Sequence, residues 1–255
     1  MPFLRTVWLS KRLAEKPLVL MQGVPGLGLV GKIAVQYLID HLDAELVARI
    51  YSDYLQLPAG LPGVEVSGGT IHPPSYDLYL YEPPDLDESF LFLTSEVQPV
   101  PSGQYAVGEA VLDAMSSLGE PLYVFTFGGY VPGDSAVVGV FASSNDEDLL
   151  RKLESHRVKR LDGGFITGAA GVLVALAHLR GISSACVLST TSGHMPDPLA
   201  SKRILVLVGE MFGLEVDLSD LEGMIRRVPP RPSESEEGEA PSVAEEGEED
   251  ISYYL

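Results

Sequence analysis

Short apolar runs alternate with helically spaced apolar positions through most of the chain. Residues 18–23 are an apolar run typical of a buried strand, and residues 27–42 place apolar side chains at the spacing of one helix face. The same alternation continues to about residue 228. It predicts further strands at 46–51, 78–81, 90–94, 122–127 and 185–189, and helices at 105–118, 166–179, 198–212 and 218–227.

The alternation favours an α/β fold with a mainly parallel central sheet, because buried strands that are separated by helices usually run in the same direction. We expect helices on both faces of this sheet, in three layers. Tight turns rich in Gly and Pro support this class over a helical bundle. We therefore predict one α/β domain over residues 1–228.

The composition changes at Pro229. From there to Asp250 the chain holds almost no apolar residue and many carboxylates. Such a segment cannot bury enough apolar surface to offset the entropy that it would lose on ordering. We predict that residues 229–255 are an acidic, disordered tail. The tail nevertheless ends in two aromatic residues and a leucine, Tyr253, Tyr254 and Leu255, as a docking tag would.

Charge and cysteine content exclude several classes of function. The net charge is -19, so we expect neither nucleic acid nor an anionic membrane surface as a partner. The single Cys186 excludes an internal disulfide framework, and it lies in an apolar run, where a cysteine usually acts as a small hydrophobic residue. The five histidines lack metal-ligand spacing, so we expect no metal and no cofactor. Without a signal-peptide pattern, we expect a cytoplasmic protein.

Glycine-rich segments follow several predicted strands, and in a parallel sheet they gather at the carboxyl edge, where α/β proteins keep their sites. The first matches G-x-G-x-x-G at Gly26, Gly28 and Gly31, with Asp53 about twenty residues further on, as in dinucleotide-binding proteins. The alternative is a glycine turn that lets a helix pack closely on a strand. A candidate pocket formed by these loops comprises Gly26, Gly28, Gly31, Gly128, Gly129, Ser192 and His194.

The segment from Thr191 to Pro198 contains Ser192, His194 and Asp197, the residue types of a hydrolase triad. The chain has no G-x-S-x-G motif. Asp197 followed by Pro198 is instead typical of a helix start, because aspartate caps free N–H groups and proline suits the first helical position. We favour the helix start, which leaves no predicted catalytic residue.

The C-terminus resembles the hydrophobic–Tyr–any tag of proteasome activators. The resemblance makes Tyr253 the hydrophobic position and Tyr254 the penultimate tyrosine, and Leu255 supplies the terminal carboxylate. In proteins with this tag, the tyrosine and the carboxylate enter pockets between neighbouring α subunits of the proteasome. Such recognition combines an aromatic anchor with a charged hydrogen bond.

The body is similar to the proteasome assembly chaperone family of α/β proteins. The resemblance rests on the order and spacing of several segments, which are residues 17–31, 127–130, 168–171, 191–193 and 196–198. Archaeal members of that family form homo-oligomers, and some carry the tag and bind the core proteasome without ATP. The likeness implies the same for this chain, which also lacks the P-loop of ATP-driven unfoldases.

We therefore expect a binding protein rather than an enzyme, with the proteasome α ring and further copies of itself as partners. The likeness leaves open whether such docking opens the gate of the proteasome or guides its assembly. The alternative is an enzyme or a small-molecule or nucleotide binder that uses the glycine-rich loops. A pocket lined by converging polar groups would favour this alternative, and a closed edge would favour the binding protein.

Overall fold

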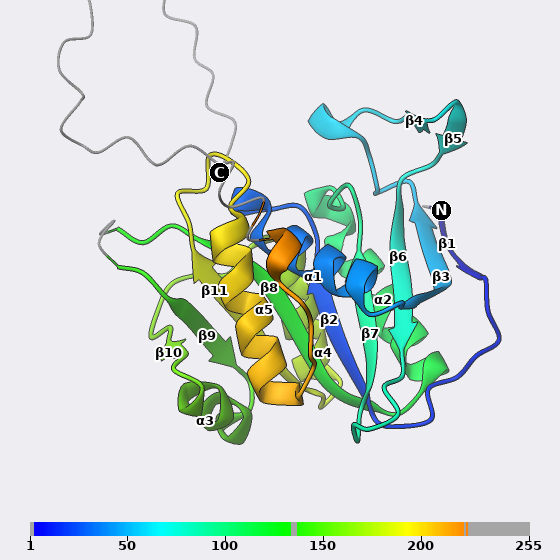
Figure 1. Cartoon of the computed structure of the whole chain (residues 1–255). Helices are drawn as coiled ribbons and strands as arrows, with labels where there is room; N and C mark the ends of the chain where they lie inside the picture. The colour runs from blue at the N-terminus through cyan, green and yellow to red at the C-terminus, as the bar shows by residue number, and fades with distance from the viewer. Residues whose placement is uncertain (1–2, 134–136, 222, 224–255) are drawn as a thin grey trace, which may run out of the picture.

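The computed structural model describes residues 3–133, 137–221 and 223 of the chain. They form one nine-stranded sheet with helices against its faces, and a separate two-stranded hairpin (Figure 1). The main-sheet strands are β1 (Leu4–Trp8), β2 (Leu18–Gly23), β3 (Glu45–Ser52), β6 (Ser75–Tyr81), β7 (Ser89–Thr94), β8 (Pro121–Tyr130), β9 (Val140–Ser144), β10 (Lys159–Arg160) and β11 (Ser183–Thr190). The α-helices are α1 (Val30–His41), α2 (Gln104–Leu118), α3 (Glu147–Ser155), α4 (Gly168–Leu179) and α5 (Pro198–Phe212).

The sheet is mixed, so the prediction of a mainly parallel sheet is wrong. The strand order is β1-β3-β6-β7-β2-β8-β11-β9-β10. The four central strands β7, β2, β8 and β11 run parallel to one another. On one flank the pairing is antiparallel between β1 and β3, between β3 and β6, and between β6 and β7. On the other flank β9 runs antiparallel to β11.

Connection lengths explain the antiparallel flanks. A parallel connection needs about a dozen residues or more and usually contains a helix. The link between β6 and β7 is only residues 82–88, and residues 53–74 between β3 and β6 contain no α-helix. The link between β8 and β9, residues 131–139, is also shorter than a dozen residues. Where α2 and α4 precede the central strands β8 and β11, the predicted parallel arrangement appears.

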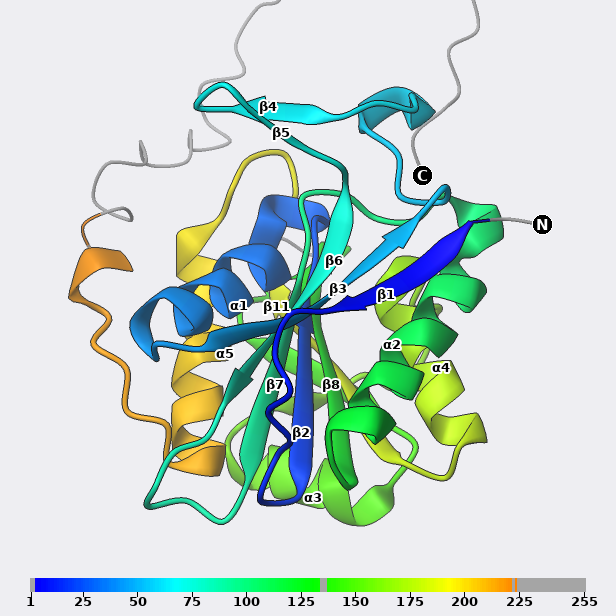
Figure 2. The ribbon, with the colours of Figure 1, turned by 90° about the vertical axis from the view of Figure 1, so that its right-hand side faces the viewer.

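Helices cover both faces of the sheet, which confirms the predicted three layers. Figure 2 shows α1 and α5 on one side and α2 and α4 on the other. Alternate residues of the central strands supply the two cores, as period-two side-chain direction requires. Val19, Met21 and Phe125 belong to the core under α1 and α5, whereas Leu18, Leu20 and Val124 belong to the core under α2 and α4.

The predicted helices at 105–118, 166–179 and 198–212 correspond to α2, α4 and α5. The pattern did not identify β1, β9 or α3. The helix predicted at 218–227 is helical at residues 219–221 and 223, and its remaining positions lie outside the described residues. The predicted tail from residue 229 also lies outside them. Within the part of the chain that the structure describes, every helix is too short or too polar to cross a bilayer.

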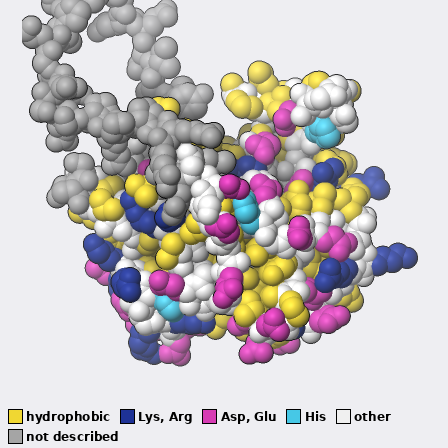
Figure 3. Space-filling view, in the orientation of Figure 1, with side chains coloured by type: hydrophobic (Ala, Val, Ile, Leu, Met, Phe, Trp, Pro, Cys, Tyr) yellow, Lys and Arg dark blue, Asp and Glu magenta, His cyan; other side chains and the backbone are white. Residues whose placement is uncertain are grey.

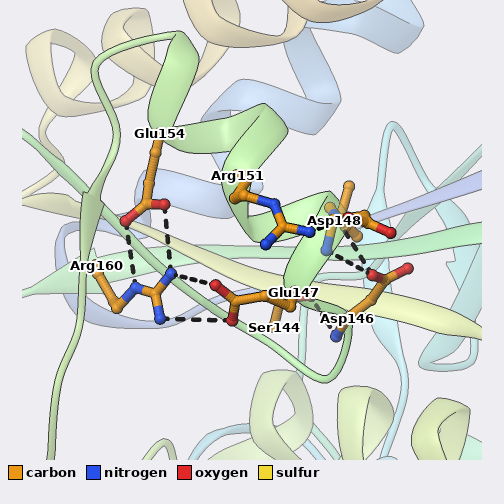
Figure 4. A network of polar contacts seen from close by, with 8 residues as sticks. Ser144, Asp146, Glu147, Asp148, Arg151, Glu154 and Arg160 are labelled. Atoms are coloured by element: carbon orange, nitrogen blue, oxygen red, sulfur yellow. Dashed lines mark hydrogen bonds and ion pairs between the residues drawn. The ribbon is translucent and has the colours of Figure 1, made fainter.

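Helix α3 and the short edge strand β10 are held together by charged side chains (Figure 4). Arg160 of β10 forms ion pairs with Glu147 at 2.7 Å and with Glu154 at 3.2 Å, both on α3. Asp146 caps the helix: its Oδ1 accepts the N–H groups of Asp148 at 2.8 Å and Leu149 at 3.3 Å. Its Oδ2 accepts the hydroxyl of Ser183 at 2.6 Å. Asp146 thus connects α3 to the central strand β11.

Asp146→Ala is expected to lower the free energy of unfolding by about 1 kcal/mol, as loss of an N-cap does, whereas Asp146→Asn keeps most of the cap. The hydrogen bond from Ser183, followed by those from the helix N–H groups, lowers the pKa of Asp146. A group with a lowered folded-state pKa stabilises the fold above its unfolded pKa of about 3.9, and this contribution is lost as the pH falls through the folded value. Urea unfolding should therefore separate wild type from Asp146→Asn more at pH 7 than at pH 3. An equal difference at both pH values would contradict this role of the carboxylate.

Candidate functional site

The glycine-rich loops do gather at one edge of the sheet. The parallel strands β2, β7, β8 and β11 end at this carboxyl edge, at Gly23, Thr94, Tyr130 and Thr190. Residues 24–29, 131–139 and 191–197 follow three of these strands, so the positions expected for the first and third loops are confirmed. Gly128 and Gly129 instead lie within β8, immediately before its last residue, Tyr130.

The glycines of the first loop are required for close packing. A Cβ on Gly31 would lie 2.1 Å from the carbonyl oxygen of Phe127, and a Cβ on Gly23 would lie 2.1 Å from the carbonyl oxygen of Gly31. Real Cβ atoms do not approach this closely, so α1 packs against β2 and β8 only because these positions are glycine. Gly28 has φ of +61°, which also favours glycine. Gly26 has an extended backbone and only one ordinary neighbour within 4 Å.

The dinucleotide interpretation of this loop is not supported by the position of Asp53. In dinucleotide-binding folds, the acidic residue lies at the tip of the strand beside the glycine turn. Here Asp53 follows β3, and β6 and β7 lie between β3 and β2. The carboxylate of Asp53 instead accepts the N–H of Phe3 at 3.1 Å, next to the edge strand β1. The glycine motif therefore serves helix–strand packing.

The loops also close over one another. Gly28 donates its N–H to the carbonyl of Gly193 at 3.3 Å, and Asp197 donates its N–H to the carbonyl of Gly28 at 2.8 Å. A Cβ on Gly129 would lie 2.3 Å from the carbonyl oxygen of Leu27, so the first loop rests directly on β8. The first and third loops thus fill the edge above β8 with backbone.

Gln98 and Lys32 close the edge toward β7 and α4. The amide of Gln98 donates to the carbonyl of Pro25 and accepts the N–H of Ala169 at 3.3 Å, so it occupies a donor at the start of α4. Lys32 of α1 donates to Thr94 Oγ1 at 3.0 Å and pairs with Glu96 at 2.7 Å. These polar groups therefore satisfy one another.

The segment from Thr191 to Pro198 starts a helix, as predicted. Asp197 Oδ1 accepts the N–H of Ala200 at 2.9 Å, and Pro198 is the first residue of α5. Asp197 Oδ2 accepts the hydroxyl of Thr191 at 2.8 Å. Ser192 and His194 are exposed on the loop, and the only carboxylate of this segment is engaged as a helix cap. The arrangement is that of a capped helix rather than of a catalytic triad.

Cys186 lies in β11 and is fully buried. Burial raises the pKa of its thiol to about 11, so the thiolate that a nucleophile requires is not formed near neutral pH. Among the described residues, no three or more His, Cys, Asp and Glu side chains converge as a metal site would require.

Two hollows of the surface lie away from the glycine-rich loops. One, of about 690 Å³, lies between the second half of α5 and residues 214–218. The other, of about 580 Å³, lies between β1, the end of β3 and the base of the hairpin formed by β4 (Glu65–Ser67) and β5 (Thr70–His72). Neither includes Gly26, Gly28, Gly31 or His194. Ligand binding by the candidate loop pocket therefore stays the alternative to a protein-binding role, and a nucleotide-binding experiment tests it.

NAD, NADP and ATP at millimolar concentration are expected to leave Tm unchanged. A site with micromolar affinity would add about 4 kcal/mol of stability at a thousandfold ligand excess. Differential scanning fluorimetry with and without each nucleotide measures this directly. A reproducible upward shift with any of them would restore the small-molecule interpretation of the loops.

The segment that leads to the C-terminus is attached to α1. After α5 the chain turns back, and Leu221 is fully buried in the core under α1 and α5. Tyr37 donates its hydroxyl to the carbonyl of Asp217 at 2.6 Å, and His41 lies 3.7 Å from the carboxylate of Asp220. The predicted tag residues Tyr253, Tyr254 and Leu255 lie outside the described residues.

Comparisons with known proteins give one consistent result. The sequence model of the PAC2 family matches residues 20–229. Two uncharacterized proteins of Methanocaldococcus jannaschii are 30% and 29% identical to this chain, over 80% and 81% of its length and 77% and 80% of theirs.

Solved structures agree with this match. The structure of Pyrococcus furiosus PbaB, described as an archaeal proteasome activator, has a TM-score of 0.79 and 27% identity, over 89% of this chain and 96% of that one. PbaA of the same organism, described as an archaeal homologue of a proteasome-assembly chaperone, has a TM-score of 0.70 and 24% identity, over 87% of each chain. The likeness to PbaA concerns the fold.

Proposed function

This chain belongs to the PAC2 family, and from this membership we propose that it is a proteasome-binding protein that acts without ATP and is not an enzyme. Its role is that of an activator or an assembly chaperone homologue. It is a cytoplasmic homo-oligomer, and it docks its C-terminal tails into pockets of the proteasome α ring.

The likeness to PbaB carries this proposal. It combines a TM-score of 0.79 with 27% identity, and it extends over 96% of a protein described as a proteasome activator. The likeness therefore includes the whole α/β body rather than one motif. Function depends on sites as well as on fold, so the tag is the part of the proposal that must be tested directly.

The closed carboxyl edge favours a binding protein over the small-molecule alternative. Small-molecule sites are usually concave and lined by a few converging polar groups. Here backbone atoms of Leu27, Gly28 and Gly193 fill the edge, and Asp197, Gln98 and Lys32 are engaged in structural contacts. The side chains of Leu27, Val131 and Met195 are 51%, 48% and 66% exposed, which suits contact with a protein better than with a polar ligand.

The tag would act through three simple interactions. The ring of Tyr254 would fill an apolar pocket, its hydroxyl would form a hydrogen bond, and the carboxylate of Leu255 would pair with a basic group. Tyr253 requires only an apolar ring. About twenty linker residues after Pro229 give a flexible reach of roughly 25 Å, so several tails can search neighbouring pockets.

Tyr254→Ala and deletion of Leu255 are each expected to abolish binding to the core proteasome, because each removes one anchor of a small contact. Tyr253→Phe is the matched control and should bind as wild type does. Surface plasmon resonance against immobilised core proteasome measures all four proteins, with light scattering to confirm that mass is unchanged. Equal binding by wild type and the Leu255 deletion would disprove the tag mechanism.

A further inference from the structure

The two edges of the main sheet differ in how well they are protected. Edge strands expose unpaired N–H and C=O groups, and proteins usually protect them with short length, charge, proline or bulges. The β10 edge is two residues long, and both are basic. The β1 edge is five residues long, contains no proline, and pairs with β3 in an uninterrupted register. The β1 edge is thus available for pairing with another strand.

Exposed apolar side chains gather beside β1. The hairpin β4–β5 projects from the body above the β1 side of the sheet (Figures 1 and 2), and we call residues 56–74 the arm. Val66 and Ile71 oppose each other in the hairpin and are 67% and 64% exposed. Figure 3 shows hydrophobic side chains on the arm, away from the rest of the molecule. Half of the large apolar side chains that are exposed among the described residues lie here, namely Phe3, Leu4, Trp8, Leu9, Leu13, Leu61, Val64, Val66 and Ile71.

Charge separates this surface from the rest of the chain. Residues 1–14 contain three basic residues and no carboxylate, although the whole chain has a net charge of -19. Residues 54–76 contain a single charged residue, Glu65. Two copies of so acidic a chain repel each other, and these two segments carry few of the carboxylates that cause this repulsion. A projecting two-stranded hairpin is also only marginally stable alone and gains from a partner.

We propose that two copies of this chain associate through their β1 strands, which pair antiparallel around a two-fold axis at Thr6. Leu4 then lies opposite Trp8 of the second copy, and Arg5 lies opposite Val7. Leu4, Thr6 and Trp8 share the face of β1 whose β3 partners include Ala48 and Ile50 of the core under α2 and α4. The apolar Leu4–Trp8 pairs would therefore continue this core from one copy to the next.

The register follows from the side chains. If the two strands were shifted by two residues, so that Leu4 lay opposite Thr6, Arg5 of one copy would lie opposite Arg5 of the other. Like charges that oppose each other directly are destabilising. A shift by two residues in the other direction, with Thr6 opposite Trp8, would pair only three of the five residues of β1. The antiparallel direction also brings the arm of each copy, which leaves the sheet near Leu4, to the end of the partner that carries Leu9 and Leu13. The role of this dimer rests on the proposed function, in which several copies are needed to present several C-terminal tails.

Two substitutions test the interface on the full chain by analytical ultracentrifugation. Trp8→Glu is expected to weaken self-association at least tenfold, because it removes a large apolar contact and buries a charge. Leu179→Glu is the matched control, since Leu179 is 77% exposed at the end of α4, and it should leave the mass unchanged. Circular dichroism confirms that both variants fold. A monomeric wild type, or a Trp8→Glu protein as associated as wild type, would overturn the proposal.

Cysteine cross-linking tests the register and does not depend on a disruptive variant. Thr6→Cys is expected to give a disulfide-linked dimer on mild oxidation, because the two opposed Cβ atoms lie about 5 Å apart and a shift of about 1 Å at the strand edge brings them within disulfide range. Val7→Cys is expected not to cross-link, and the native Cys186 is buried and does not interfere. Absence of a cross-link at Thr6→Cys, or a stronger one at Val7→Cys, would overturn the register.

Proteasome binding by the same proteins separates this inference from the proposed function. Trp8→Glu keeps its tag and should bind the proteasome about a hundredfold more weakly, through lost avidity. Deletion of Leu255 should keep the dimer and lose binding. A wild type that forms the cross-linked dimer without binding the proteasome would leave this interface standing and remove the proposed function.

Discussion

Gly31→Ala is expected to lower the free energy of unfolding by about 3 kcal/mol, the upper range for overpacking a well-packed interior. For a chain of this length, such a loss lowers Tm by roughly 6 to 12 °C. The cause is the 2.1 Å approach that the new Cβ would make to the carbonyl oxygen of Phe127. Backbone atoms of β8 cannot rotate aside, so α1 must move away from the sheet and lose contacts with Val19, Met21 and their neighbours in the core.

Gly26→Ala is the matched control within the same motif, and it is expected to change Tm by less than about 2 °C, as surface substitutions without special backbone needs do. Gly26 has an extended backbone, and its nearest neighbour would lie 3.8 Å from the new Cβ. Thermal unfolding of the two variants side by side decides the matter. If the motif served a dinucleotide, the first glycine would be needed for the tight turn, the second for the approach of the pyrophosphate to the backbone, and the third for helix–strand packing. Equal stability of the two variants would contradict the packing role of Gly31.

The sequence predicted the central part of the fold because its local pattern and its tertiary structure agree. The runs at 18–23, 90–94, 122–127 and 185–189 are apolar on both faces, and this is the pattern of strands that are covered by helices on both sides. Asp197 and Pro198 fixed the start of α5 to the residue, because an N-cap and a first-turn proline are local requirements.

The flanks could not be predicted in the same way, since strand direction there depends on pairing between distant segments. β6 alternates buried and half-buried residues, as a strand with one solvated face does, and it lies antiparallel to both of its neighbours. β1 was missed because four of its five residues are polar or exposed apolar residues without a clear alternation. α3 is short and strongly charged, so its apolar stripe consists of only Leu149, Leu150 and Leu153.

The glycine motif had two interpretations that sequence alone could not separate. Both require glycines at these positions, one for a phosphate and the other for a neighbouring backbone. The strand order favours the packing interpretation, because it places β6 and β7 between β3, which Asp53 follows, and the strand β2 that leads into the loop. Strand order is a property of the whole fold, and no local spacing encodes it.

Leu221→Ala is expected to lower the free energy of unfolding by about 3 kcal/mol, as removal of a fully buried leucine side chain does. Leu221 is fully buried in the core under α1 and α5, although it lies beyond the last long helix. Its neighbours along the chain are fixed by the hydrogen bond from Tyr37 to the carbonyl of Asp217. Leu179→Ala is the control, because Leu179 is 77% exposed and should tolerate the change.

Two truncations extend this prediction to the boundary of the folded domain. A chain that ends after Gly213 loses the buried Leu214 and Leu221 and exposes their neighbours on α5, so it should lose about 5 kcal/mol or fail to fold. A chain that ends after Val228 should keep the Tm of the full protein, because the residues from Pro229 onward are acidic and nearly free of apolar side chains. Thermal unfolding followed by circular dichroism measures both.

A chain ending after Val228 that melts as low as the one ending after Gly213 would show that the acidic segment contributes to the folded body. The domain boundary would then lie beyond residue 228, and the length of linker available to the tag would be shorter than its sequence suggests.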